Sequence, residues 1–144
     1  MKCEKILRKL HQSHCGGGYR KGASRGHHGY YKGFYCDSTY ELAYLIYCLD
    51  HNINIKRCSE KFEYEYNNKK HFYHPDFVIN DEIIEIKNFH RNDVNVKFEA
   101  VKKLNRKIKI LYFEDLIDIF NYVAKTYNKK VKGRGNNFYE LYDS

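Results

Sequence analysis

The sequence predicts one α/β (α+β) domain in which helices flank a four-stranded mixed sheet. The 144 residues are enough for a single domain with a buried core. Amphipathic and β-prone runs follow one another as helix, three strands, helix, strand, helix. A helical crossover joins the third strand to the fourth. Such crossovers are right-handed and give parallel pairing, whereas the first three strands should form an antiparallel meander.

The first helix of this order is expected over residues 37–50. The Asp-Ser-Thr run at 37–39 offers capping side chains at its start. Glu41 lies one turn before Leu45, so its carboxylate is either half-buried for a purpose or exposed to solvent. The apolar residues at helical spacing, which should form the buried stripe, are Leu42, Leu45, Ile46 and Leu49.

Three strands are expected next, over residues 55–66, 71–79 and 82–87. In the first of them, aromatic residues alternate with acidic residues from position 62 onward. A turn is expected at 67–70, and Asn-Asp at 80–81 is a favourable two-residue hairpin turn. The remaining elements are expected over residues 93–105 (helix), 107–113 (strand) and 114–127 (helix).

The two-residue turn fixes which side chains face one another across the second hairpin. Counting outward from it places Asp76 opposite Glu85, with their Cβ atoms about 5 Å apart. Lys87 projects from the same face because it lies two residues further along the strand. Ile84 and Ile86 project from the other face, into a core.

Two carboxylates this close repel each other, and a divalent cation between them would relieve the repulsion. Mg²⁺ prefers oxygen ligands and takes one or two protein carboxylates, with water and substrate phosphate in its other positions. A neighbouring lysine can orient or deprotonate the attacking water, or neutralise charge that develops on the phosphate. The alternative is a carboxylate pair that Lys87 neutralises on a solvated sheet face. Tyr73 and His74 flank this site and are expected to pack beside Pro75.

The net charge of +8 is concentrated near the two ends of the chain. Residues 1–35 carry +7 and residues 125–134 carry +5, whereas residues 36–124 carry −2. We therefore divide the chain into a basic N-terminal segment (1–35), a core (36–127) and a basic C-terminal tail (128–144). The basic ends are expected to bind a polyanion; basic ends that only promote solubility are the alternative.

Seven of the nine glycines lie in residues 16–33, among cations and aromatic rings. A glycine-rich backbone does not form a regular helix or strand without cost, and cations with stacking rings suit a nucleic-acid backbone and unstacked bases. This loop, which follows a short basic helix over residues 2–12, is predicted to contact DNA; a flexible arm without a partner is the alternative. The predicted DNA-contacting residues are Tyr19, Arg20, Lys21, Arg25, His27, His28, Tyr30, Tyr31 and Lys32.

The five cysteines are odd in number and lack the spacing of a small disulfide scaffold, so we expect reduced thiols in a cytoplasm. Cys3 and Cys15 are accompanied by His11 and His14 but by no CxxC motif, so a zinc site near the N-terminus is not expected. No apolar run approaches the length of a membrane span, so no membrane partner is expected.

This pattern resembles the PD-(D/E)xK nuclease superfamily, which has the restriction-endonuclease-like fold. The element order α-β-β-β-α-β matches over about residues 37–120. The blocks at 29–33, 37–41 and 73–77 also resemble small phage-type and homing-type endonucleases. The residues that carry the superfamily motif are Pro75-Asp76, Glu85-Ile86-Lys87 and, on the preceding helix, Glu41.

The resemblance implies a metal-dependent DNA endonuclease that hydrolyses phosphodiester bonds with a metal-activated water. Asp76 and Glu85 would bind Mg²⁺, for which Mn²⁺ would substitute, and the Ile86 carbonyl would be a further ligand. Lys87 would position the nucleophilic water, and Glu41 would bind the metal directly or through water. Lys97, on the following helix, would contact a phosphate; an ordinary solvated lysine is the alternative.

Two other functions stay open on the sequence. One is a structure-specific nuclease or junction resolvase that acts on branched DNA or RNA. The other is a catalytically inactive nucleic-acid-binding protein of the same fold, although the complete motif argues against it. A homodimer would supply two active sites to cut both strands. The abundance of Lys, Asn, Ile and Tyr is typical of an AT-rich genome and fits a phage or mobile element.

Overall fold

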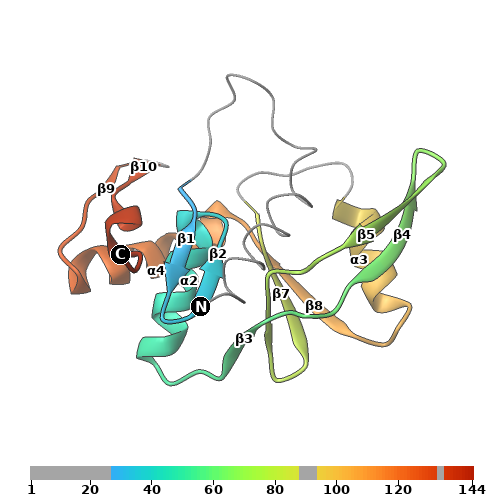
Figure 1. Ribbon diagram of the computed structural model, residues 1–144, viewed down its shortest axis with the longest axis horizontal. Helices are drawn as coiled ribbons and strands as arrows, with labels where there is room; N and C mark the ends of the chain where they lie inside the picture. Colours follow the sequence, from blue (N-terminus) through green and yellow to red (C-terminus); the bar gives the residue numbers. More distant parts are fainter. Residues whose placement is uncertain (1–26, 88–93, 133–134) are drawn as a thin grey trace.

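The computed structural model of the protein describes residues 27–87, 94–132 and 135–144 (Figure 1). The elements in chain order are β1 (Gly29–Tyr31), β2 (Phe34–Cys36), α2 (Thr39–Asp50), β3 (Ile55–Arg57), β4 (Phe62–Tyr66), β5 (Lys69–Tyr73), β6 (Phe77–Ile79), β7 (Glu82–Ile86), α3 (Val94–Lys102), β8 (Lys107–Leu111), α4 (Phe113–Thr126), β9 (Val131–Lys132), β10 (Gly135–Asn136) and the 3₁₀ helix η2 (Phe138–Leu141). A four-stranded sheet with strand order β3-β6-β7-β8 lies between the helices. The predicted α+β class with a four-stranded mixed sheet is therefore confirmed.

Strand β7 pairs antiparallel with β6 and parallel with β8. Across the β6–β7 turn, Ile79 pairs with Glu82. Both turn residues have positive φ values, 48° at Asn80 and 67° at Asp81, which is the left-handed conformation that a type I′ turn requires. This register is the one that the sequence predicts.

Two strands of the predicted meander are each divided in two. The predicted strand over 55–66 forms β3 and β4, and the predicted strand over 71–79 forms β5 and β6. Pro75 lies in the second break, where it has no N–H to donate to a neighbouring strand. A hydrogen bond from the Cys58 N–H to the Asp76 carbonyl, 3.3 Å long, joins the segment after β3 to the segment before β6. Among the described strands, β4 and β5 pair with each other alone and form a separate two-stranded hairpin (Figure 1).

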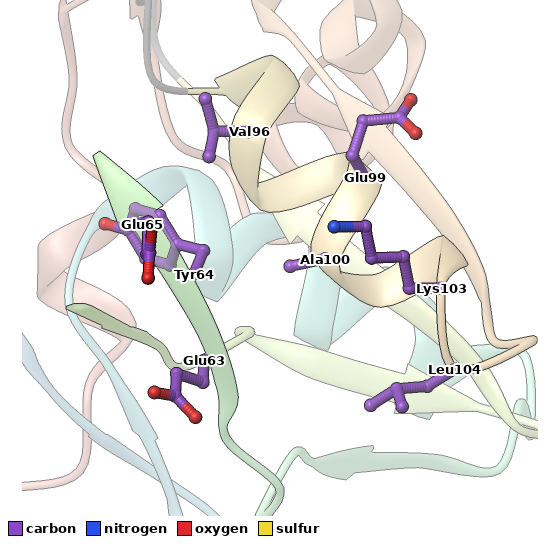
Figure 2. Close-up of a pocket in the computed structure, with 8 residues that line it drawn as sticks. All are labelled: Glu63, Tyr64, Glu65, Val96, Glu99, Ala100, Lys103 and Leu104. Carbon is purple, nitrogen blue, oxygen red and sulfur yellow. The ribbon is translucent and has the colours of Figure 1, made fainter. Parts of the chain in front are cut away.

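Helix α3 packs beside this hairpin and covers one face of the sheet. The buried apolar residues on this face are Phe62, Tyr73, Ile83 and Val101. A groove of about 710 Å³ opens between β4 and α3 (Figure 2), and its lining residues are Glu63, Tyr64, Glu65, Val96, Glu99, Ala100, Lys103 and Leu104. Three of these residues are acidic, so the groove itself does not suit a polyanion.

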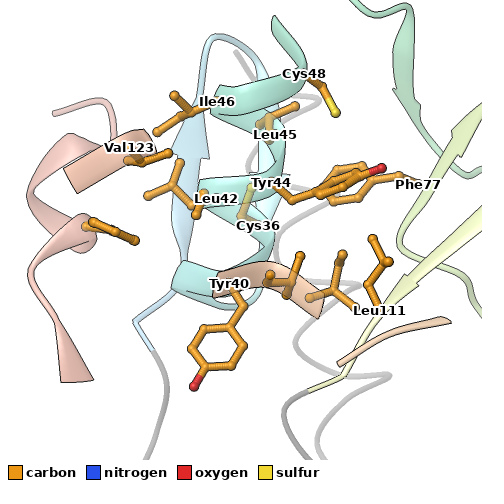
Figure 3. Packing of buried hydrophobic residues seen from close by; sticks show 14 of the residues in the cluster. Cys36, Tyr40, Leu42, Tyr44, Leu45, Ile46, Cys48, Phe77, Leu111 and Val123 are labelled. Atoms are coloured by element: carbon orange, nitrogen blue, oxygen red, sulfur yellow. The ribbon is translucent and has the colours of Figure 1, made fainter. Parts of the chain in front are cut away.

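The opposite face of the sheet carries the main core, where helices α2 and α4 pack together (Figure 3). Ser38 caps α2, because its Oγ accepts the Glu41 N–H at 3.2 Å. Nearly all of α2 from Tyr40 to Cys48 is buried, which exceeds the stripe that the sequence predicts, because the helix also contacts β2 and η2. The sheet residues in this core include Ile55, Phe77, Ile84, Ile86 and Leu111.

The two ends of the described chain pack against each other. The Asp143 N–H donates to the Tyr30 carbonyl at 2.7 Å, and the Lys32 N–H donates to Asp143 Oδ2 at 2.7 Å. A Cβ at Gly29 would lie 2.8 Å from the Tyr142 ring, so this close approach requires glycine. Phe138 is fully buried in the main core. The C-terminal segment is thus part of the folded unit, and the last residues of the expected glycine-rich loop, 29–33, belong to the β1–β2 hairpin.

Among the residues that the structure describes, no helix is both long and apolar enough to cross a membrane. Cys36, Cys48 and Cys58 are free thiols, as expected for reduced cysteines. The residues considered for zinc at positions 3, 11, 14 and 15 lie outside the described ranges.

Candidate active site

Asp76 and Glu85 come together where β6 begins and β7 ends. Phe77 pairs with Ile84, which places Asp76 and Glu85 next to each other just beyond the last registered pair. The Ile86 N–H donates to Asp76 Oδ2 at 2.8 Å and holds this carboxylate against β7. Glu85 is only 5% exposed. The structure therefore places the two carboxylates as the hairpin register predicts.

Glu85 is a buried acid that lies beside one like charge, Asp76, and one opposite charge, Lys87. Burial raises the pKa of Glu85 well above its ordinary value, and the charge of Asp76 raises it further. The nearby ammonium of Lys87 opposes this shift of the Glu85 pKa; its Nζ lies 3.6 Å from Glu85 Oε1. Because Glu85 is buried, a neutralised pair on a solvated sheet face does not describe this site.

Tyr73 is a further partner of Glu85. Its hydroxyl donates a hydrogen bond to Glu85 Oε2, and the residue is 4% exposed. Burial and the adjacent Glu85 charge raise the pKa of Tyr73 far above its ordinary value, so the phenol keeps its proton and acts as a donor. Lys97, on α3, places its Nζ 5.6 Å from the centroid of the Tyr73 ring. The predicted phosphate-binding lysine therefore adjoins the carboxylate pair through Tyr73.

Glu41 is the second buried carboxylate, at 4% exposure. Its Oε1 accepts from Arg57 Nη1 at 3.1 Å, and its Oε2 accepts from Ser38 Oγ at 3.2 Å. The Arg57 guanidinium lies 5.1 Å from the centre of the Phe77 ring. Burial and the charge of Asp76 raise the pKa of Glu41 to about 8, while Arg57 acts in the opposite direction. Glu41 is thus near Asp76, as predicted, but is already paired with a cation.

The donor set suits a divalent cation at Asp76 and Glu85. Among the described residues, no three His, Cys, Asp or Glu side chains are arranged as a ready-made metal-binding group. Both oxygens of Glu41 accept hydrogen bonds, from Arg57 and Ser38, whereas Asp76 and Glu85 lie next to each other at the strand ends. Two carboxylates match Mg²⁺, which keeps several waters and takes substrate phosphate. A cation there would also relieve the repulsion that raises the pKa of Glu85.

The predicted DNA-contacting residues of the glycine-rich segment are only partly described. Tyr19, Arg20, Lys21 and Arg25 lie outside the described residues. His27 is exposed and stacks on Tyr139, with ring centroids 4.2 Å apart. Lys32 is exposed at the tip of the β1–β2 hairpin, beside which α2 lies in Figure 1. The β1–β2 hairpin packs with α2 in the main core on one face of the sheet, whereas Lys97 lies on α3, which covers the other face.

Three aromatic side chains of the same hairpin pack against neighbours. Tyr30 meets Tyr35 edge-on with ring centroids 5.3 Å apart, and His28 lies 6.3 Å from the Tyr35 ring. Tyr31 is 8% exposed and belongs to the main core. Successive residues of a strand face opposite sides and Tyr31 takes the inward one, so its burial does not support the predicted DNA contact, which stays a prediction.

Arg57 and Tyr73 contact the acidic residues of the site but were not among the predicted site residues. Arg57 pairs in register with Phe77, directly beside Asp76, so a correct β3–β6 register would have indicated it. Tyr73 lies at the end of β5, and no periodic pattern distinguishes it from a core aromatic. Comparisons of the chain with protein-family models, curated proteins and solved structures find no match.

Proposed function

We propose that this protein is a metal-dependent DNA endonuclease with a restriction-endonuclease-like PD-(D/E)xK core. The observation that carries the proposal is the buried Glu85 carboxylate, held beside Asp76 with the Lys87 ammonium 3.6 Å away. Isolated buried acids of like charge destabilise a fold, so this arrangement favours a functional purpose. Two carboxylates and one lysine at adjacent strand ends are also groups that can hold a divalent cation and orient a water for hydrolysis of a phosphodiester.

Asp76 and Glu85 are the residues that would hold Mg²⁺ or Mn²⁺, with the Ile86 carbonyl beside them. When bound there, the cation would stabilise charge on the phosphate and lower the pKa of a bound water. Lys87 supplies a positive charge that orients the attacking water. Its side chain is 20% exposed, so it is near the carboxylate yet open to substrate.

Substrate attraction is supported by the charge of the chain. The net charge of +8 favours association with a polyanion, and its effect should weaken with added salt. Lys97 is a candidate phosphate contact beside the carboxylate pair, because its Nζ lies near the ring of Tyr73, whose hydroxyl donates to Glu85. His27 and Lys32 would contact DNA further from the site.

The test is incubation of the purified protein with supercoiled plasmid in EDTA, Mg²⁺ or Mn²⁺. Nicking or linearisation should require the metal and should be lost in Lys87→Ala. Lys107→Ala is the matched control, because it removes an exposed lysine that pairs with Glu82, at the other end of β7 from Glu85, and should cut like wild type. Binding without cleavage of duplex, junction or RNA substrates under any metal would overturn the proposal in favour of a nucleic-acid-binding protein.

A further inference from the structure

We infer that Tyr73 is a positioning residue that holds the carboxylate Glu85 through its hydroxyl and the lysine Lys97 through its ring. The inference rests on the proposed function, because it concerns how the metal-binding and phosphate-binding groups of that site are held together. One side chain would thereby set the relative placement of two groups that come from different elements, β7 and α3.

The hydroxyl end is fixed by its surroundings. Tyr73 is the last residue of β5 and pairs with Phe62, the first residue of β4, at the base of the hairpin. It packs in the small cluster with Ile83 and Val101, which restricts its rotamer. Its hydroxyl reaches Glu85, and this bond is a polar contact between the hairpin and β7. A buried donor of this kind orients a metal-binding carboxylate as an outer-shell partner does.

The ring end engages a cation. Lys97 Nζ lies 5.6 Å from the centroid of Tyr73 and 6.0 Å from that of Tyr64. Tyr64 occupies the position diagonal to Tyr73 on the same face of the hairpin and stacks on its partner His71, with centroids 5.3 Å apart. Two aromatic faces therefore share the ammonium of one lysine, a geometry that attracts cations. The rings hold Lys97 close to the carboxylate pair without a direct ion pair to Glu85 being needed.

Substitutions can separate the contribution of the Tyr73 hydroxyl from that of its ring. Tyr73→Phe removes the hydroxyl and keeps the ring, whereas Tyr73→Leu removes both. Tyr64 supplies matched substitutions, since its ring also faces Lys97. Tyr64→Phe should change neither property, and Tyr64→Leu should affect only the placement of Lys97.

Two affinities are measured without relying on cleavage. Mn²⁺ binding is followed by the electron paramagnetic resonance signal of free Mn²⁺ in the absence of DNA. DNA binding is followed by the fluorescence anisotropy of a labelled duplex in EDTA. Tyr73→Phe should bind Mn²⁺ about 10- to 100-fold more weakly and bind DNA like wild type. Tyr73→Leu should weaken Mn²⁺ binding to the same extent and also weaken DNA binding by about two- to fivefold, whereas Tyr64→Leu should weaken only DNA binding, by a similar factor.

Each contrary result has a distinct meaning. Wild-type Mn²⁺ affinity in Tyr73→Phe would overturn the inference and leave the proposed nuclease intact. Equal loss of DNA binding in Tyr73→Phe and Tyr73→Leu would also overturn it, because the ring would then have no role of its own. If wild type binds no Mn²⁺ and cuts no substrate, the proposed function itself fails and the inference fails with it. Thermal unfolding of Tyr73→Phe near the wild-type temperature controls for loss of the fold.

Discussion

Strand β7 presents Ile84 and Ile86 to one face of the sheet, and Ile83 and Glu85 to the other. On the first face these residues join a large apolar core with α2 and α4. The second face has only a small apolar cluster under α3 and the β4–β5 hairpin, and it accepts a buried charge. Alternate positions of a single strand thus serve stability on one side and the proposed chemistry on the other.

The two buried glutamates differ in where they lie. The Asp76 carboxylate raises the pKa of both, and both have a cation nearby, Arg57 for Glu41 and Lys87 for Glu85. Both oxygens of Glu41 accept hydrogen bonds at the contact of α2 with β3, from Arg57 and Ser38. Glu85 lies next to Asp76 at the strand ends, where one cation would meet both carboxylates.

The largest effect that would test this comparison is expected from Asp76→Asn. The substitution should lower metal-dependent plasmid cleavage by at least about 10³-fold, because it removes one of two anionic ligands. The free energy of unfolding should stay within about 1 kcal/mol of wild type, because the Asn oxygen can still accept the Ile86 N–H. Initial cleavage rates and urea unfolding measure the two quantities. A collapse of stability with the activity would make Asp76 a structural residue.

The apolar face should respond in the opposite way. Leu42→Ala should lower the free energy of unfolding by about 2 to 5 kcal/mol, because Leu42 is fully buried in the main core. The folded fraction should keep its cleavage rate. The matched control is Ile117→Ala on α4, where the residue is 43% exposed and the expected loss is below about 0.5 kcal/mol. A selective loss of metal dependence in Leu42→Ala would break the division between the two faces.

Added Mn²⁺ should stabilise the protein and do so more at pH 8 than at pH 6. The pKa of Glu85 is raised, so at lower pH the folded protein must release a proton before it can bind the metal. At a concentration of 100 times Kd, one bound ion raises the free energy of unfolding by about 2.7 kcal/mol. Denaturant unfolding with and without Mn²⁺ measures this, and Glu85→Gln should lose the effect. The same stabilisation in Glu85→Gln would place the ion elsewhere.

A smaller effect, on the pH dependence of the free energy of unfolding, is expected from Glu41. The pKa of Glu41 is about 8 in the folded protein against an ordinary value of 4.5, so the folded state keeps a proton that the unfolded state has lost. The free energy of unfolding should therefore fall as the pH rises between these values. Relative to wild type, Glu41→Gln should gain about 1 kcal/mol or more from pH 5 to pH 8, since one pKa unit corresponds to about 1.4 kcal/mol. A constant difference across this range would mean that Arg57 keeps Glu41 ionised.

The parts of the fold that depend on local chemistry were predictable from the sequence. Asn80 and Asp81 specify a tight turn, and the turn alone determines that Asp76 faces Glu85. Ser38 specifies the start of α2 in the same local way. Lys87 follows from the strand period and lies beside Glu85 as expected.

The features that depend on tertiary contacts were not predictable. The strand breaks near Pro75 bend the chain and create the β4–β5 hairpin, and only this bend brings Tyr73 onto Glu85. The pairing of Arg57 with Glu41 joins α2 to β3 across the sheet edge and follows no sequence period. Phe138 lies in a segment that reads as a basic tail, although its cluster of aromatic neighbours could have indicated packing.

The most direct test of the metal site is an anomalous difference map from crystals of the protein soaked in Mn²⁺. The account predicts a peak within coordination distance of the Asp76 and Glu85 carboxylates, with Glu41 still bonded to Arg57. Absence of that peak at a Mn²⁺ concentration that supports cleavage, or a peak at other residues, would contradict the assignment of the metal to this carboxylate pair.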